Sequence, residues 1–189
     1  MIVYLHGFNS SPQSHKAQLL ERYLQELGLG AQYLCPALPP LARGAIAEAE
    51  RIMQPHRGAS ICFVGSSLGG FYATYLAERH GAKAVLLNPA VDPHVGLRAH
   101  LGPQRNLHSG ASYELSEAHL REWRNFYTER ITPQRYLLLV ETGDEVLDYR
   151  NAVARYAGAE QVVRQGGDHS LQSFAEHLPR IVRFAGLLR

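Results

Sequence analysis

The sequence has few cysteines, little net charge and no long hydrophobic run. The two cysteines, Cys35 and Cys62, lie in stretches of strand character without C-x-x-C spacing, which favours buried, reduced thiols over a disulfide. A net charge of +2 gives no reason to expect a nucleic acid or a membrane as a partner. The apolar run at residues 1–5 is too short for a signal peptide, and no run of transmembrane length follows it. These absences favour a cytoplasmic location.

Signatures of cofactor and metal binding are also missing. The chain has no Gly-x-Gly-x-x-Gly dinucleotide fingerprint, and its glycine-rich stretch near residue 67 lacks the lysine that a phosphate-binding loop needs. His-Glu-x-x-His spacing is absent, and the histidines between residues 92 and 132 have no cysteine or carboxylate cluster beside them. We therefore expect no metal and no cofactor.

The most informative stretch that is present joins an apolar run to a glycine-rich turn. Residues 61–64 are β-prone, Gly65-Ser66-Ser67-Leu68-Gly69 follows, and apolar residues at helical spacing come next. This pattern is typical of the nucleophile elbow of serine hydrolases, with Ser67 as nucleophile. Side chains at the two glycine positions would collide with neighbouring elements. A serine that only caps a helix gives a similar pattern, so the interpretation depends on partners downstream.

Strands and helices alternate along most of the chain. Strand-like runs at 1–5, 31–35, 61–64, 83–87, 135–141 and 161–164 are separated by helical stretches, and a last amphipathic helix, interrupted by Pro179, closes the chain. The alternation predicts one domain with an α/β-hydrolase fold that lacks the usual leading antiparallel strands. We expect six parallel strands flanked by helices, in the spatial order 2-1-3-4-5-6.

The alternation breaks between residues 92 and 132. This segment has a Gly-, Asn- and Ser-rich middle and a predicted helix from 116 to about 130. We expect it to form a small cap inserted over the site, and we call residues 92–132 the cap.

Two later loops supply partners for Ser67. A strand ends at Thr142-Gly143-Asp144, and the last strand is followed by Gly166-Gly167-Asp168-His169. The chain order Ser67, Asp144, His169 is that of α/β-hydrolases, in which histidine takes the serine proton and the acid orients the imidazole. Asp144 has alternatives in Glu145, one residue further along, and Asp148, which is better explained as a helix N-cap. Asp168 fits a turn or cap residue.

The assembled motifs resemble those of the YqiA-like esterase family of small bacterial α/β-hydrolases. The resemblance rests on five segments, at residues 4–12, 65–70, 87–90, 142–149 and 166–169, and covers nearly the whole chain except the cap, which matches poorly. It implies a cytosolic esterase or acyl-CoA thioesterase with Ser67, Asp144 and His169 as triad. It also implies that the backbone N–H groups of Phe8 and Leu68 form the oxyanion hole. From the residues alone, a strand followed by His-Gly and a polar loop favours a second oxyanion donor there over a simple turn at Gly7.

The substrate is expected to be a small acyl ester or thioester. The candidate pocket residues are His6, Trp123, Phe126 and Tyr127. A short cap favours short-to-medium acyl groups, and the cap arginines Arg98, Arg105 and Arg124 are candidate contacts for a phosphate-bearing leaving group, although such arginines are more often solvated. The competing interpretation is a non-catalytic binding protein on a hydrolase scaffold.

Overall fold

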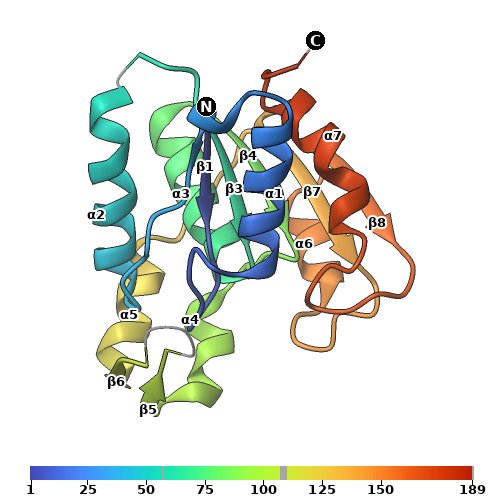
Figure 1. Ribbon diagram of the computed structural model, residues 1–189. Helices are drawn as coiled ribbons and strands as arrows, with labels where there is room; N and C mark the ends of the chain where they lie inside the picture. Colours follow the sequence, from blue (N-terminus) through green and yellow to red (C-terminus); the bar gives the residue numbers. More distant parts are fainter. Residues whose placement is uncertain (57, 107–109, 189) are drawn as a thin grey trace.

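A six-stranded parallel sheet forms the centre of the computed structural model, which describes residues 1–56, 58–106 and 110–188 (Figure 1). Residues 107–109 of the expected cap lie outside the described residues. The strands stand in the order β2-β1-β3-β4-β7-β8, which confirms the predicted order. Their bounds are β1 Ile2–Leu5, β2 Tyr33–Leu34, β3 Cys62–Ser66, β4 Lys83–Leu87, β7 Tyr136–Glu141 and β8 Glu160–Arg164.

Helices cover both faces of the sheet. Helices α1 (His15–Glu26) and α7 (Phe174–Phe184) pack on one face, against side chains such as Ile2 and Val85. Helices α2 (Ala42–Met53), α3 (Leu68–His80) and α6 (Tyr149–Arg155) pack on the other face, against side chains such as Val3 and Leu86. Short 3₁₀ turns at Gly30–Gln32, Gln54–His56 and Pro133–Arg135 complete the connections outside the cap.

Two expected elements differ in detail. Helix α7 continues through Pro179, because Phe174, Leu178, Ile181 and Val182 bury its apolar face on both sides of the proline. The predicted interruption is therefore wrong, and the helix lacks only the hydrogen bond that the proline cannot donate. The edge strand β2 is shorter than expected, because a 3₁₀ turn occupies residues 30–32 and leaves two residues paired with β1.

The cap lies at the carboxyl end of the strands, the end towards which β1 points in Figure 1. It contains α4 (Pro93–Gly96), a 3₁₀ turn at Leu97–His100, β5 (Gly102–Arg105), β6 (Ser112–Leu115) and α5 (Glu117–Asn125). Strands β5 and β6 form an antiparallel hairpin, which the sequence did not predict. Helix α5 ends at Asn125, earlier than expected, although Trp123 at its last turn is fully buried.

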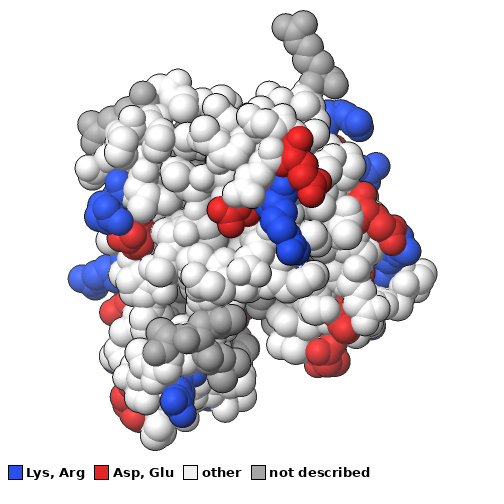
Figure 2. Space-filling view, in the orientation of Figure 1, with Lys and Arg blue, Asp and Glu red and all other residues white. Residues whose placement is uncertain are grey.

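The surface shows no strong charge pattern on the face seen in Figure 2, where basic and acidic side chains are interspersed. This agrees with the net charge of +2. Among the described residues, no helix combines the length and the apolar character needed to cross a membrane.

A first prediction concerns Gly69, in the first turn of α3. A Cβ atom at this position would lie 1.9 Å from the backbone oxygen of Leu5. Gly69→Ala should therefore destabilise the protein by about 2 kcal/mol or more in urea unfolding, although alanine favours helices. Gly96→Ala is the control, because a Cβ there meets no atom within 4 Å. Equal stabilities of the two variants would contradict the prediction.

Candidate active site

Ser67 occupies the turn between β3 and α3, with the strained backbone angles φ 53° and ψ −119°. The neighbouring strand fixes this turn from both sides: the Ser67 N–H donates to the Leu87 carbonyl at 3.0 Å, and the Ala90 N–H donates to the Ser67 carbonyl at 3.0 Å. A Cβ atom on Gly65 would lie 2.3 Å from the carbonyl oxygen of Gly69. The glycines at both ends of the pentad therefore permit backbone contacts that hold the serine in place.

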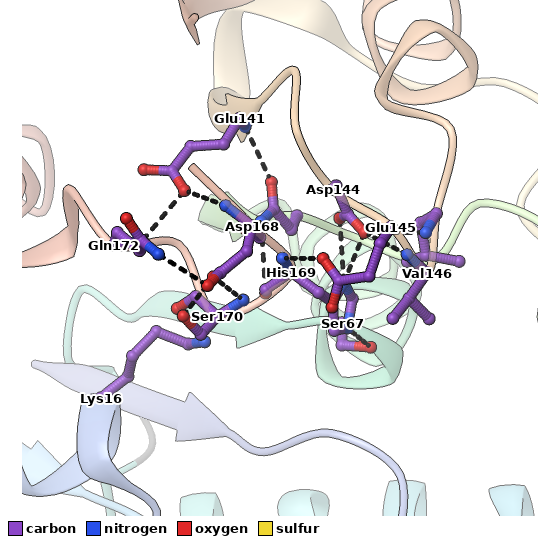
Figure 3. Close-up of polar contacts among 12 residues, drawn as sticks. Lys16, Ser67, Glu141, Asp144, Glu145, Val146, Asp168, His169, Ser170 and Gln172 are labelled. Carbon is purple, nitrogen blue, oxygen red and sulfur yellow. Dashed lines mark hydrogen bonds and ion pairs between the residues drawn. The ribbon is translucent and has the colours of Figure 1, made fainter. Parts of the chain in front are cut away.

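The structure brings Ser67, His169 and Asp144 into one hydrogen-bonded line (Figure 3). The Nε2 atom of His169 lies 3.0 Å from Ser67 Oγ, and its Nδ1 atom lies 2.9 Å from Asp144 Oδ2. The Asp144 side chain is 1% exposed, whereas the His169 side chain is 23% exposed. Asp144 is thus shielded from solvent, whereas His169 lines the open cavity.

Asp144 is held as a carboxylate. Burial alone would raise its pKa, but hydrogen bonds from His169 and from the Leu147 and Val146 N–H groups bring the pKa below its ordinary value. An ionised acid at this place can stabilise a positively charged imidazole.

The other acidic side chains of these loops have different contacts. Glu145 accepts a hydrogen bond from the His169 backbone N–H at 3.0 Å rather than from the ring. Asp148 caps α6 by accepting from the Arg150 N–H. Asp168 accepts from the Ser170 N–H and thereby stabilises the turn that follows it. Asp144 is the carboxylate that these contacts place against the imidazole.

Glu141, the last residue of β7, organises the loop that carries His169, and the sequence analysis did not single it out. The residue is 1% exposed, and its carboxylate accepts four hydrogen bonds, from the N–H groups of Asp168, Gln172 and Ser173 and from the Ser173 hydroxyl. Figure 3 shows the bonds from Asp168 and Gln172. Burial alone would raise the Glu141 pKa, but these bonds bring it below its ordinary value. The sequence does contain a feature that could have identified Glu141: a carboxylate follows directly on an apolar strand, and a carboxylate buried there requires polar partners.

Asn88, at the end of β4, ties the same loop to the sheet. Its side-chain Nδ2 donates to the carbonyl oxygens of Asp168 and His169, while its Oδ1 accepts from the Glu141 N–H at 3.0 Å. From α1, Lys16 Nζ donates to the Ser170 carbonyl at 2.7 Å. The backbone on both sides of His169 is therefore fixed by three elements.

Two backbone donors lie beside Ser67. Gly7 packs so closely that a Cβ atom on it would lie 3.3 Å from Ser67 Cβ, which brings the following Phe8 to the serine. Leu68 begins α3, where N–H groups lack helical partners. Within the described ranges, no backbone hydrogen bond outside the helices and strands uses the N–H of Phe8 or Leu68.

The site opens into a cavity of about 900 Å³ between the sheet, the cap, α1 and the start of α7. Its apolar wall comes from both the body and the cap and includes Phe8, Leu68, Leu97, Leu147, Leu171 and Phe174. Polar side chains, among them Ser10, His15, Lys16 and Gln172, also line it. The cavity around Ser67 thus offers both apolar and polar contacts.

The expected pocket residues lie elsewhere, which corrects the sequence analysis. The cavity lining, taken over the described residues, contains none of His6, Trp123, Phe126 and Tyr127.

Partners that the sequence could not reveal hold these side chains. His6 is 3% exposed and its Nε2 accepts from the Leu38 N–H at 3.0 Å. Trp123 is fully buried and donates to the Tyr72 hydroxyl at 3.0 Å. Phe126 packs edge-to-face on Tyr75 with ring centroids 5.0 Å apart. The guanidinium of Arg155 lies 5.0 Å from the Tyr127 ring.

The cap arginines also stand apart from the cavity. Arg98 pairs with Glu117 at 2.7 Å, and Arg105 Nε donates to the Gly110 carbonyl. None of Arg98, Arg105 and Arg124 belongs to the cavity lining in the part of the chain that the structure describes. In that same part, no group of three or more His, Cys, Asp or Glu side chains is placed to hold a metal ion.

A second prediction follows from the Glu141 carboxylate. Glu141→Gln replaces an acceptor by an amide whose NH₂ faces donors, so it should destabilise the protein by about 1–3 kcal/mol at pH 7. Because the folded-state pKa is lowered, the wild-type stabilisation is complete above the unfolded-state pKa of about 4.3 and is lost as pH falls through the folded-state value. The unfolding free energy of Glu141→Gln should therefore fall short of the wild-type value by less near pH 3 than at pH 7, as measured by urea unfolding at both pH values. Glu160→Gln, in an exposed ion pair, is the control; an equal loss at both pH values would refute this account.

Comparison with solved structures places the fold among the α/β-hydrolases. A putative hydrolase from Agrobacterium vitis S4 superposes with a TM-score of 0.77 at 19% identity, covering 97% of this chain and 87% of the other. Alpha/beta hydrolase domain-containing protein 10 from mouse gives a TM-score of 0.74 at 16% identity, covering 98% and 88%. These similarities confirm the predicted fold class.

Sequence comparison finds relatives of nearly the same length. A UPF0227 protein of Yersinia enterocolitica is 26% identical over 191 residues, covering 99% of both chains. UPF0227 protein YcfP of Salmonella gallinarum is 24% identical over 189 residues, again covering 99% of both. A family model matches residues 1–186, and this agrees with the resemblance read from the motifs. The chain therefore belongs to the family described as Uncharacterised protein family (UPF0227).

Proposed function

We propose that this protein is a serine hydrolase that cleaves short-to-medium acyl esters through Ser67, His169 and Asp144. The observation that carries the proposal is the line of contacts from Ser67 Oγ to His169 Nε2, at 3.0 Å, and from His169 Nδ1 to Asp144, at 2.9 Å, beneath an open cavity. Among the structural neighbours, Est1E from Butyrivibrio proteoclasticus was solved with ferulic acid bound, and another is described as an esterase domain from Rhodothermus marinus.

The first half-reaction would form an acyl-enzyme. Ser67 Oγ attacks the ester carbonyl while His169 Nε2 accepts the hydroxyl proton, and Asp144 stabilises the resulting imidazolium. His169 then donates this proton to the departing alkoxide. In the second half-reaction His169 removes a proton from water, the water oxygen attacks the acyl carbon, and Ser67 recovers its proton as the acid leaves.

The N–H groups of Phe8 and Leu68 are the proposed oxyanion donors. Both residues line the cavity beside Ser67, and Leu68 lies at the N-terminus of a helix of 13 residues, whose dipole favours negative charge there. Fixed donors of this kind stabilise the tetrahedral intermediate without reorganising during the reaction.

The cavity chemistry favours neutral esters over nucleotide thioesters. Its lining, within the described ranges, has an apolar wall and one Lys or Arg side chain, Lys16, whose ammonium already donates to the Ser170 carbonyl. The cap arginines that were candidate phosphate contacts lie outside it. An acyl-CoA thioesterase acting by the same mechanism is the second candidate and rests on the same catalytic groups.

A cytoplasmic location is part of the proposal. Cys35 and Cys62 are both free thiols. Burial raises the pKa of each to about 12, so both stay protonated and unreactive at neutral pH. Reduced, buried thiols are usual in proteins of reducing compartments.

A third prediction tests the nucleophile. The purified protein should react covalently with a fluorophosphonate at one serine, and Ser67→Ala should abolish labelling and lower ester turnover on the order of 10⁵ to 10⁶-fold. Urea unfolding of the variant checks that it is folded. A wild-type protein that is never labelled and hydrolyses nothing would favour the non-catalytic binding protein, and a fully active Ser67→Ala would exclude the mechanism.

A fourth prediction concerns the acyl group. Across neutral esters with acyl chains of two to twelve carbons, kcat/KM should rise with each CH₂ by at most the factor that corresponds to about 0.8 kcal/mol, and then level off or fall at short-to-medium length. Matching CoA thioesters should be poorer substrates, because the cavity offers few partners for phosphates. A steady rise through twelve carbons, or a preference for the thioesters, would require a different substrate class.

A further inference from the structure

The loop that carries the Phe8 N–H contacts the cap through the side chain of Asn9. Asn9 has a φ of 51°, a left-handed conformation that asparagine adopts more readily than most other residues that carry a side chain. Both ends of its amide contact the hairpin: Oδ1 accepts from the Tyr113 hydroxyl of β6 at 2.7 Å, and Nδ2 donates to Gln104 Oε1 of β5 at 3.1 Å. Gln104 Nε2 donates in turn to the His100 carbonyl at 2.7 Å, which fixes the Gln104 amide.

The residues on either side of Asn9 contact the cap as well. The Phe8 ring packs edge-to-face on Tyr113 with centroids 6.5 Å apart, and its centroid lies 5.8 Å from that of His100. The carbonyl of Ser10 accepts from Asn106 Nδ2 at 3.1 Å. Three consecutive residues of the loop are thus tied to the cap.

The same loop is pressed against the nucleophile from the other side. Gly7 lies in close contact with Ser67, and the Ser10 N–H donates to the Gly7 carbonyl at 3.3 Å, which closes the loop into a turn. The distance between the Phe8 N–H and the carbon that Ser67 attacks is therefore set by two supports, the elbow and the cap hairpin. Reaction rates respond strongly to such distances, since a misplacement of about 1 Å costs on the order of 100-fold.

We propose that Asn9 is a positioning residue, and that the hairpin β5–β6, acting through Tyr113 and Gln104, holds the Phe8 N–H where the oxyanion develops. This inference rests on the proposed function. It assigns the cap a part in turnover as well as in roofing the cavity. The Tyr113 hydroxyl is protonated and able to donate at neutral pH, and burial raises its pKa further, to about 12.

Three variants test the tether. Tyr113→Phe combined with Gln104→Ala removes both partners from the cap side. Asn9→Gly removes the amide but keeps a residue that tolerates positive φ. Tyr72→Phe is the matched control: it also deletes one hydroxyl at the contact between cap and body, the one that accepts from Trp123, and among the described residues this hydroxyl makes no hydrogen bond to the loop.

The measurements are kcat and KM for a short neutral ester, with hydrogen exchange of the peptide covering residues 6–12. We expect the double variant and Asn9→Gly each to lower kcat about 10- to 100-fold with KM changed less than about 3-fold, because the lost interaction acts on the transition state. Exchange in the peptide should be faster in the double variant than in Tyr72→Phe, whose kcat should equal the wild-type value.

The outcomes separate this inference from the proposed function. If wild type is active and the tether variants keep its kcat, or raise only KM, the positioning role is wrong while the hydrolase proposal stands. A kcat loss as large in Tyr72→Phe would also overturn it, because general loosening of the cap would then suffice. If wild type neither reacts with a fluorophosphonate nor hydrolyses an ester, the positioning role of Asn9 in catalysis is wrong together with the proposed function. Unchanged hydrogen exchange in the double variant would show that the hairpin does not hold the loop, whatever the activity.

Discussion

The site depends on how closely helix α3 approaches the ends of β1 and β3. At Gly69 and Gly65 the backbones come so near that no Cβ atom would fit, and the chain between these glycines has to turn with Ser67 at positive φ. The same approach brings Gly7 against Ser67, so the loop after β1 is positioned by the turn after β3. Short-range repulsion between backbones thereby determines the direction of the serine hydroxyl and provides one of the two supports of the Phe8 N–H, the other being the cap hairpin.

The loop that carries His169 is held by hydrogen bonds instead. Asn88 and Glu141 end two neighbouring strands, and between them they bind both the backbone before and the backbone after His169. Gly167 adopts a positive φ beside the Glu141 carboxylate, where a Cβ atom would lie 1.9 Å from Oε2. A buried carboxylate with four donors is costly to remove, because each donor would be left without a partner in the interior.

The sequence predicts the parts of this arrangement that follow from local patterns. Strand order, the elbow and the succession Ser67, Asp144, His169 can be read from apolar runs and from glycines at fixed spacing. Trp123, Phe126 and Tyr127 show where this reasoning ends, because aromatic residues at helical spacing suit a pocket wall and a core equally well. Their positions are decided by Tyr72, Tyr75 and Arg155, which lie far away in the sequence. The hairpin β5–β6 was missed for a related reason: Gly102 and Pro103 interrupt any strand pattern, and the side chains of Gln104 and Tyr113 contact Asn9, which lies far away in the sequence.

The place of the cap in the sheet has a consequence for how proteins of this fold diversify. The cap leaves the body after β4 and returns at β7, and these strands are hydrogen-bonded neighbours, so its two ends are close together and another segment can occupy the same interval without altering the strand order. Free exchange of modules is nevertheless restricted here. A different cap would have to provide a hydrogen-bond donor and an acceptor to Asn9 and an aromatic ring to Phe8. Without them, the loop beside Ser67 would lose its contacts with the cap. Recombination among relatives should consequently preserve the loop at residues 6–10 and the hairpin as one inherited unit, while the remainder of the cap is free to vary with the substrate.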